Sequence, residues 1–174
     1  VLLPGFAGGT PPDWERARVA AGLGGVVLFA RNVTGAGQLA DLTAALRAER
    51  EDVVVAIDEE GGDVTRLDAA TGSLVPGNWA LGVVDDPALT AAVAAAQARR
   101  LAAAGITLTL APVADVNSNP ENPVIGVRSF GADPDLVARH TVAFVAGTQS
   151  VGVAACAKHF PGHGDTSTDS HMNM

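Results

Sequence analysis

The stretch VGVAACAKHFPGHGDTSTDSH, residues 151–171, joins an apolar run to a loop dense in chemically active side chains. The apolar part, 151–157, predicts a buried strand, and the loop after it holds three histidines, two aspartates and a lysine. Pro161, Gly162 and Gly164 allow this loop to turn tightly and to bring imidazoles and carboxylates into one small volume. A strand that ends in such a cluster indicates an active site.

The rest of the chain alternates between apolar strand-like runs and longer helix-like runs. Short continuous apolar segments of the kind that is buried on both faces predict strands at 26–29, 53–57, 106–110 and 153–157, with 1–3 as the remnant of another. Runs rich in Ala, Leu, Arg or Gln predict helices at 12–21, 36–50, 87–104 and 134–148. Two of these helices begin at an aspartate–proline pair, a typical helix start. The alternation predicts a parallel α/β fold.

Polar side chains follow the strands at their carboxyl ends. Asp58 comes after 53–57, Asp115 after 106–110, and Lys158 after 153–157. In a (β/α)8 TIM barrel the catalytic groups collect on this face from several strands. A doubly wound sheet would favour a glycine-rich phosphate turn after its first strand, and the sequence contains no such motif. We therefore expect a TIM-barrel type fold, present as an incomplete fragment of about five β/α units, because a whole barrel takes about 250 residues.

Composition restricts the classes of partner. The chain has 174 residues, of which 48% are hydrophobic and 17% charged, and its net charge is −8. No basic run is present, so nucleic acid is excluded as an expected partner. The longest apolar stretch is too short to span a bilayer, and no signal peptide is visible. The single cysteine, Cys156, lies in an apolar run and is expected to pack there as a small hydrophobe.

Two chemistries fit the loop that follows residue 157. Asp169 and His171 are separated by one residue, so a carboxylate can orient an imidazole that then donates and accepts protons near neutral pH. Alternatively, His159, His163 and His171 with the nearby aspartates could bind a divalent metal ion. The spacing argues against the metal, because Pro161 and the two glycines disfavour the helix that would align an H-x3-H pair.

Four motifs, taken together and in order, resemble the bacterial β-N-acetylglucosaminidases of glycoside hydrolase family 3. The loop at 158–171 resembles the family's K-H-F-P-G-H-G-D-x-x-x-D-S-H signature. The other three are IDEEGGDVTR at 57–66, APVADV at 111–116 and IGVRSFG at 125–131. One departure is Asp63, where relatives often carry arginine. The resemblance implies that residues 1–174 are part of the family's N-terminal catalytic domain, cut short at the C-terminus and at the N-terminus.

The resemblance also implies roles for individual residues. Asp169 and His171 match a dyad in which the histidine serves as general acid and then as general base. The positions that match residues binding the sugar hydroxyls in the −1 subsite are Asp58, Arg66, Arg128, Lys158 and His159. For Arg66 and Arg128 the alternative is a plain surface salt bridge, and we expect His140 and His163 to be structural, His140 as a half-exposed helix residue. The nucleophilic aspartate of a retaining mechanism is expected beyond residue 174.

The function implied by the resemblance is hydrolysis of terminal non-reducing β-linked N-acetylglucosamine, without a metal or organic cofactor. The expected partner is a saccharide or muropeptide that contains GlcNAc, and the fragment alone is expected to be inactive. Alternatives are a phosphorolytic variant or a β-glucosidase of the same family, and, from another class, an inactive sugar-binding module. We expect a cytoplasmic location, with secretion open because the chain begins without methionine. The oligomeric state and the natural aglycone are left open.

Overall fold

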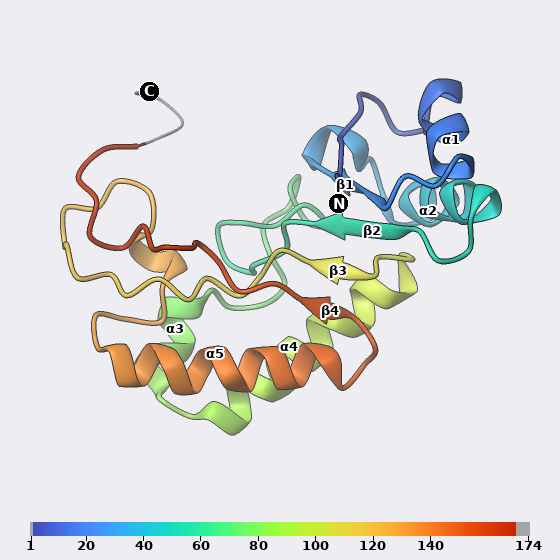
Figure 1. The fold of residues 1–174 in the computed structure, drawn as a ribbon. Helices are drawn as coiled ribbons and strands as arrows, with labels where there is room; N and C mark the ends of the chain where they lie inside the picture. Colours follow the sequence, from blue (N-terminus) through green and yellow to red (C-terminus); the bar gives the residue numbers. More distant parts are fainter. Residues whose placement is uncertain (1, 170–174) are drawn as a thin grey trace.

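Four parallel strands form the centre of the computed structural model, which describes residues 2–169. The strands are β1 (Gly25–Leu28), β2 (Val54–Ile57), β3 (Leu108–Thr109) and β4 (Ala154–Ala155). Each pairs only with its neighbours in sequence, in the order β1-β2-β3-β4, and Val26 lies opposite Val55 in the first pair. Doubly wound sheets reverse their strand order at a switch point, whereas a barrel adds each strand to the same edge. The consecutive order thus agrees with the predicted α/β fold of barrel type, and the described strands do not close the barrel (Figure 1).

Five α-helices within residues 2–169 connect and cover the strands. They are α1 (Asp13–Ala20), α2 (Ala36–Glu49), α3 (Asn78–Val84), α4 (Pro87–Ala103) and α5 (Pro134–Gln149), with short 3-10 helices η1 (Ala30–Asn32) and η2 (Gly126–Arg128). The predicted aspartate–proline starts are confirmed: the Asp86 carboxylate accepts hydrogen bonds from the Ala88 and Leu89 N–H groups, and Asp133 accepts one from Asp135. Such caps satisfy N–H groups that have no partner inside the helix. None of the helices within residues 2–169 is long and apolar enough to cross a membrane.

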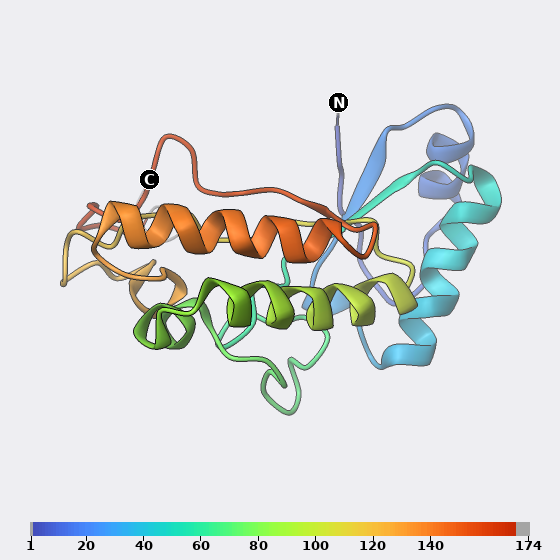
Figure 2. The same cartoon turned by 90° about the horizontal axis from the view of Figure 1, so that it is seen from below.

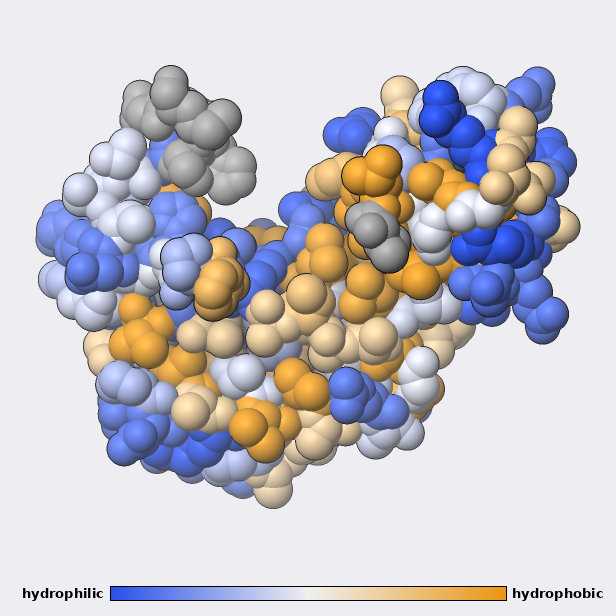
Figure 3. Space-filling model, viewed as in Figure 1, coloured by the Kyte–Doolittle hydropathy of each residue, from blue (hydrophilic) through white to orange (hydrophobic). Residues whose placement is uncertain are grey.

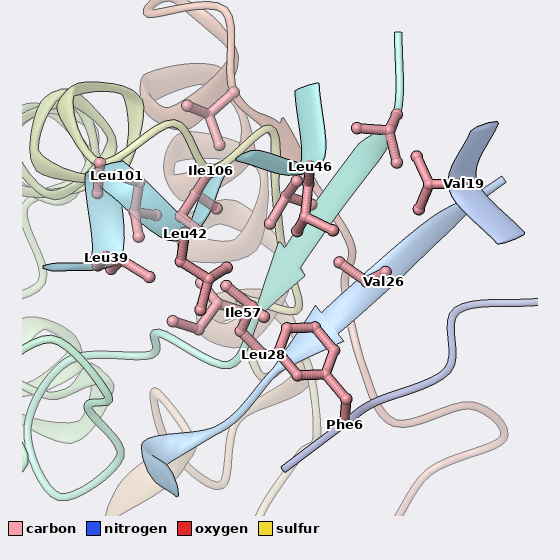
Figure 4. Packing of buried hydrophobic residues seen from close by; sticks show 14 of the residues in the cluster. Phe6, Val19, Val26, Leu28, Leu39, Leu42, Leu46, Ile57, Leu101 and Ile106 are labelled. Carbon is pink, nitrogen blue, oxygen red and sulfur yellow. The ribbon is translucent and has the colours of Figure 1, made fainter. Parts of the chain in front are cut away.

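The main core lies between the sheet and the helices that follow β1 and β2. Side chains from alternate strand positions, such as Val26, Leu28 and Ile57, pack against Leu42 and Leu46 of α2 and against Leu101 of α4 (Figure 4). All are at most 1% exposed. Burial of one such leucine contributes about 1.5–3 kcal/mol to folding. A second cluster joins α3, α4 and α5, which lie side by side (Figures 1 and 2).

The other face of the sheet is open. Ala154 of β4 is exposed and Val27 of β1 is only partly buried, and the molecule is hollowed on this side (Figure 3). The prediction for Cys156 was wrong, because this cysteine is exposed rather than packed in a core. Cys156 follows the edge strand β4. Side chains along a strand point to alternate faces, so Cys156 lies opposite buried Val153 and on the same face as exposed Ala154, which is the uncovered face of the sheet.

Other differences from the predicted elements are local. Residues 2–3 are not in a strand. The next residue, Pro4, nevertheless lies beside β1, because its carbonyl accepts a hydrogen bond from the Val27 N–H of that strand. The described sheet therefore has four strands where about five were expected. Helix α3 was missed, because NWALGVV is only seven residues long and its apolar content resembles a strand. This helix borders the carboxyl ends of the strands, so it matters for the site.

Candidate active site

The carboxyl ends of β2, β3 and β4 bring three motifs to one edge of the sheet. Asp58 follows β2 directly, and Lys158 lies three residues after the last residue of β4. An isolated parallel bridge between Val113 and Lys158 continues the pairing of β3 with β4 past the strands themselves. The Ala114 N–H donates to the Lys158 carbonyl at 2.6 Å, which holds the segment after β4 against the segment after β3.

Lys158 is the cation at the centre of this edge. Its Nζ lies 2.7 Å from Asp58 Oδ1 and 2.6 Å from Glu60 Oε1. The Lys158 side chain is 16% exposed and that of Glu60 only 3%. Two carboxylates that are this close together need a shared cation, because like charges in a partly buried site repel each other strongly.

Arg128 binds Glu60 as well, through a second ion pair. Its Nε and Nη2 donate to the two Glu60 oxygens at 2.9 Å and 2.8 Å, a forked geometry that is stronger than a single contact. The hydrogen bonds to Glu60 raise the pKa of the Arg128 guanidinium above its ordinary value. The alternative of a plain surface salt bridge is thus wrong for Arg128, whose side chain is 19% exposed and faces a buried carboxylate.

His159 is oriented by Asp115. The imidazole Nδ1 lies 2.6 Å from Asp115 Oδ2, and the His159 and His163 backbone N–H groups donate to the same carboxylate. Burial alone would raise the pKa of Asp115, yet these hydrogen bonds hold it below its ordinary value. An ionised carboxylate only accepts, so Nδ1 carries a proton and Nε2 faces the Arg128 guanidinium, 3.4 Å from Nη2.

Arg66 is placed by the turn between β2 and α3. The buried carboxylate of Glu59 accepts from the Arg66 and Leu67 N–H groups at 2.7 Å and 3.0 Å, which fixes the backbone there. Arg66 Nη2 lies 3.7 Å from Asp58 Oδ2, too long for a hydrogen bond. Its Nε is buried and has no hydrogen-bond partner within residues 2–169. The Arg66 side chain is 27% exposed and lines the cleft described below, although Nε itself is out of contact with solvent.

The loop after His159 is held by the segment that follows β3. Asn122 Nδ2 donates to the carbonyls of His163 and Thr166, and Ser118 donates to Asp165. Gly164 packs directly on the Val116 carbonyl, where a side chain would collide with the backbone. The Lys158–His159 and Phe160–Pro161 peptide bonds are cis. The loop is thus held in place as far as Thr166.

A cleft of about 470 Å³ lies above these groups. Its lining includes the five residues predicted to bind a ligand, which come from three separate segments: Asp58, Arg66, Arg128, Lys158 and His159. The charged groups in the cleft are three cations and two carboxylates, which largely neutralise one another. Such a cleft offers fixed donors and acceptors without a strong net charge, and this suits a neutral ligand that carries many hydroxyl groups.

Of the two predicted acid–base residues, the structure describes Asp169 and not His171. Asp169 is the last described residue of the loop and is partly buried, and it is not among the residues that line the cleft. His171 lies outside the described residues. The pairing of these two side chains therefore stays a prediction.

Two further residues belong to the site, although neither was given a role from the sequence. Glu60 joins Lys158 to Arg128, and Asp115 orients His159. Both lie within the quoted motifs, in EEGG and in APVADV, so their positions were visible but their partners were not. Nothing in the linear spacing says which charge across the sheet each carboxylate meets.

The remaining histidines in the described part of the chain are His140 and His163, and the expectation for His140 needs a correction. His140 is fully buried rather than half-exposed: Nδ1 lies 2.8 Å from Thr90 Oγ1 and Nε2 lies 3.1 Å from Asp85 Oδ1. It stacks on Phe130 between α4 and α5, and two polar partners make this burial tolerable. His163 lies beside Thr166 in the loop, edge-on to His159, and it also lines the cleft, so its structural role stays a prediction. Within residues 2–169 no three His, Cys, Asp or Glu side chains gather in a way that could hold a metal ion.

Comparison with known proteins identifies the architecture. Residues 14–174 match the model of the glycosyl hydrolase family 3 N terminal domain. A beta-hexosaminidase of Bordetella avium is 41% identical, and the match covers 99% of this chain and 51% of that protein. Beta-hexosaminidase A of Pseudoalteromonas piscicida is 38% identical over 94% of this chain and 29% of its own length. The chain thus spans about half the length, or less, of these curated relatives.

Solved structures agree with the sequence relatives. A glycoside hydrolase family 3 beta-N-acetylglucosaminidase from Paenibacillus sp. str. FPU-7 superposes with a TM-score of 0.90 at 43% identity, covering 97% of this chain and 33% of that one. NagZ from Neisseria gonorrhoeae, solved with N-trifluoroacetyl-D-glucosamine, gives a TM-score of 0.87 at 34% identity over 98% of this chain and 52% of its own. The four-stranded arrangement is therefore similar to the corresponding part of these larger domains.

Proposed function

Because the chain belongs to glycoside hydrolase family 3, we propose that the protein hydrolyses the bond to a terminal, non-reducing β-linked N-acetylglucosamine. The substrate would be a saccharide or muropeptide that contains GlcNAc. Support comes from the relatives, which are beta-hexosaminidases and beta-N-acetylglucosaminidases, and from one structure of a relative with a GlcNAc analogue.

The observation that carries the proposal is the cleft formed by Asp58, Arg66, Arg128, Lys158 and His159. A pyranose presents neighbouring hydroxyls that both donate and accept. The Asp58 carboxylate accepts from such hydroxyls, while the partly exposed Arg66 guanidinium donates. Because Lys158 and Arg128 already hold Glu60, they stand in place before the sugar arrives. Such preorganisation reduces the entropy that binding costs.

The chemical step is proposed to use Asp169 and His171. A carboxylate hydrogen-bonded to one imidazole nitrogen orients the other nitrogen toward the glycosidic oxygen, which is protonated as the bond breaks. The same imidazole then removes a proton from the attacking water. Retention requires a carboxylate nucleophile that forms a glycosyl-enzyme intermediate. We propose that this nucleophile is an aspartate beyond residue 174, as the family resemblance implies.

The experiment compares substrates on the protein as encoded by its gene. We expect release of the aryl group from an aryl β-GlcNAc, with a higher kcat/KM than on the matching aryl β-glucoside and no requirement for phosphate. Turnover that depends on phosphate would establish the phosphorolytic alternative. Preference for the glucoside would establish the β-glucosidase. Saturable binding with no release would establish a sugar-binding module and overturn hydrolysis.

Two variants test the assigned residues. Asp58→Asn should lower kcat/KM about 10- to 100-fold, because one or two hydrogen bonds from sugar hydroxyls to a charged acceptor are weakened. His171→Ala should lower kcat by about 100-fold or more, as expected for loss of a general acid–base group. Asp52→Asn is the matched control, since that carboxylate is 83% exposed and outside the cleft. Activity that is indifferent to His171 would remove the dyad from the mechanism.

A further inference from the structure

A second cavity, of about 280 Å³, lies behind the Glu60–Arg128 ion pair. Glu60 and Arg128 line both this cavity and the cleft, so the pair forms the wall between them. The far side is built by the turn after β2, by the start of α3 and by Val127 of η2. None of the five predicted ligand residues except Arg128 takes part in it.

The backbone of this cavity is closely packed. Gly61 and Gly62 lie against Pro76 and Gly77, and a Cβ on Gly62 would be 2.8 Å from the Gly77 Cα. The Gly62 N–H donates to the Val75 carbonyl at 3.1 Å. The floor is therefore fixed by main chain rather than by movable side chains.

Its side chains offer acceptors and an aromatic surface. Asn78 is 2% exposed, and while its Nδ2 donates to the Arg128 carbonyl at 2.8 Å, its Oδ1 is buried without a hydrogen-bond partner within residues 2–169. Asp63 is exposed at the rim, and no partner of its carboxylate is present in that part of the chain. The Trp79 side chain also lines the cavity and is 43% exposed.

These features select the ligand. An unsatisfied buried amide oxygen costs free energy unless a donor reaches it, and Asp63 adds a negative charge. The face of an indole attracts cations and packs against the C–H faces of sugars. The one cation of the lining, Arg128, is already engaged by Glu60. A ligand that brings its own positive charge and several hydroxyl donors matches this set.

We propose that this cavity, defined by Asp63, Asn78 and Trp79, binds an amino sugar through its protonated amine. The site is separate from the cleft and does not rest on the proposed hydrolysis. The ammonium group would sit with the Asp63 carboxylate, and the ring would pack on Trp79. A small opening at the start of α3 would let a hydroxyl donate to Asn78 Oδ1, which is out of contact with solvent in this structure.

The two tryptophans of the chain make the test direct, because only Trp79 lines the cavity. In a Trp14→Phe background, the fluorescence of Trp79 is titrated with glucosamine below neutral pH and with glucose, which has a hydroxyl in place of the amine. We expect a saturable change with glucosamine and weaker binding of glucose. Asp63→Asn should raise the glucosamine Kd about fivefold and leave that of glucose within about twofold. A Trp79→Phe variant, which keeps Trp14, should show no response.

Two controls keep the outcome decisive. Glu51→Gln removes an exposed charge outside the cavity and should leave the glucosamine Kd unchanged. Asp58→Asn alters the cleft and should also leave the Trp79 response in place. If glucosamine gives no saturable signal, or if its Kd responds to Asp58→Asn and not to Asp63→Asn, the ligand does not bind in this cavity and the proposal is wrong.

Discussion

Lys158 and Asp58 meet across the sheet, with Nζ and Oδ1 2.7 Å apart, although they are separated by 100 positions in the chain. The same ammonium contacts Glu60 Oε1 at 2.6 Å. One lysine after β4 therefore bridges two carboxylates after β2. This contact ties the segment after the last described strand to the segment after the second.

Replacing Lys158 by methionine should be destabilising. The variant keeps much of the packed stem but leaves Glu60, which is 3% exposed, with Arg128 as its only cation within the described residues. We expect the free energy of unfolding to fall by about 3 kcal/mol, the cost typical of breaking a buried ion pair. Urea denaturation measures it. Lys158→Arg, which keeps the charge, should lose less, and equal losses would show that charge is not the cause.

Replacing Asp115 by asparagine tests the pH dependence of stability. The folded-state pKa of Asp115 lies below the ordinary value of 3.8, because hydrogen bonds from His159 and His163 outweigh the effect of burial. A lowered pKa gives stability that is present above 3.8 and is lost as the pH falls through the folded value. The difference in unfolding free energy between wild type and Asp115→Asn should therefore shrink as the pH is lowered below that value.

At neutral pH the comparison of wild type with Asp115→Asn measures how much the ionised carboxylate contributes to the free energy of unfolding. Asp115→Asn should cost about 1.5–3 kcal/mol, as expected for weakening hydrogen bonds to a buried charged acceptor. Asp68 also has a lowered pKa, held down by its hydrogen bonds from Arg100, so wild type alone would not isolate Asp115. A difference that is independent of pH across the acid range would contradict the assignment of an ionised Asp115.

Gly164→Ala should displace the loop that leads to the proposed dyad. A Cβ at this position would overlap the Val116 carbonyl oxygen, which is backbone and cannot rotate away. We expect a loss of about 1–3 kcal/mol in unfolding free energy, typical of overpacking, and a larger loss of aryl β-GlcNAc turnover. Gly37→Ala in α2 is the control, since nothing lies within 4 Å of its added Cβ. Similar stability of the two variants would mean that the loop moves freely.

Glu59 should act through the backbone that carries Arg66. Glu59→Ala removes the acceptor for the Arg66 and Leu67 N–H groups, so we expect a loss of about 2–3 kcal/mol in unfolding free energy and a raised KM. Glu59→Gln keeps one carbonyl oxygen in that place and should retain most of both. Differential scanning calorimetry and steady-state kinetics report the two effects. If the alanine variant raised KM without loss of stability, the turn would be held by other contacts.

Much of the fold was readable from local pattern. The apolar runs at 26–29 and 53–57 became β1 and β2, and the aspartate–proline pairs became capped helix starts, because each depends only on residues close in the chain. Cys156 was misjudged for the same reason: its own run is apolar, but whether an edge strand is covered depends on what packs on it. His140 was misjudged because its partners, Thr90 and Asp85, come from α4 and the turn before it.

The sequence by itself determined the alternation of strands and helices, the placement of polar motifs at the ends of strands, and five of the residues that line the cleft. Only the tertiary structure decided how these residues pair. The division of Glu60 between Lys158 and Arg128, and the orientation of His159 by Asp115, arise from the register of β2, β3 and β4. The spacing of apolar residues along the chain indicates whether a segment is a helix or a strand. A contact across strands depends instead on how separate elements align in space.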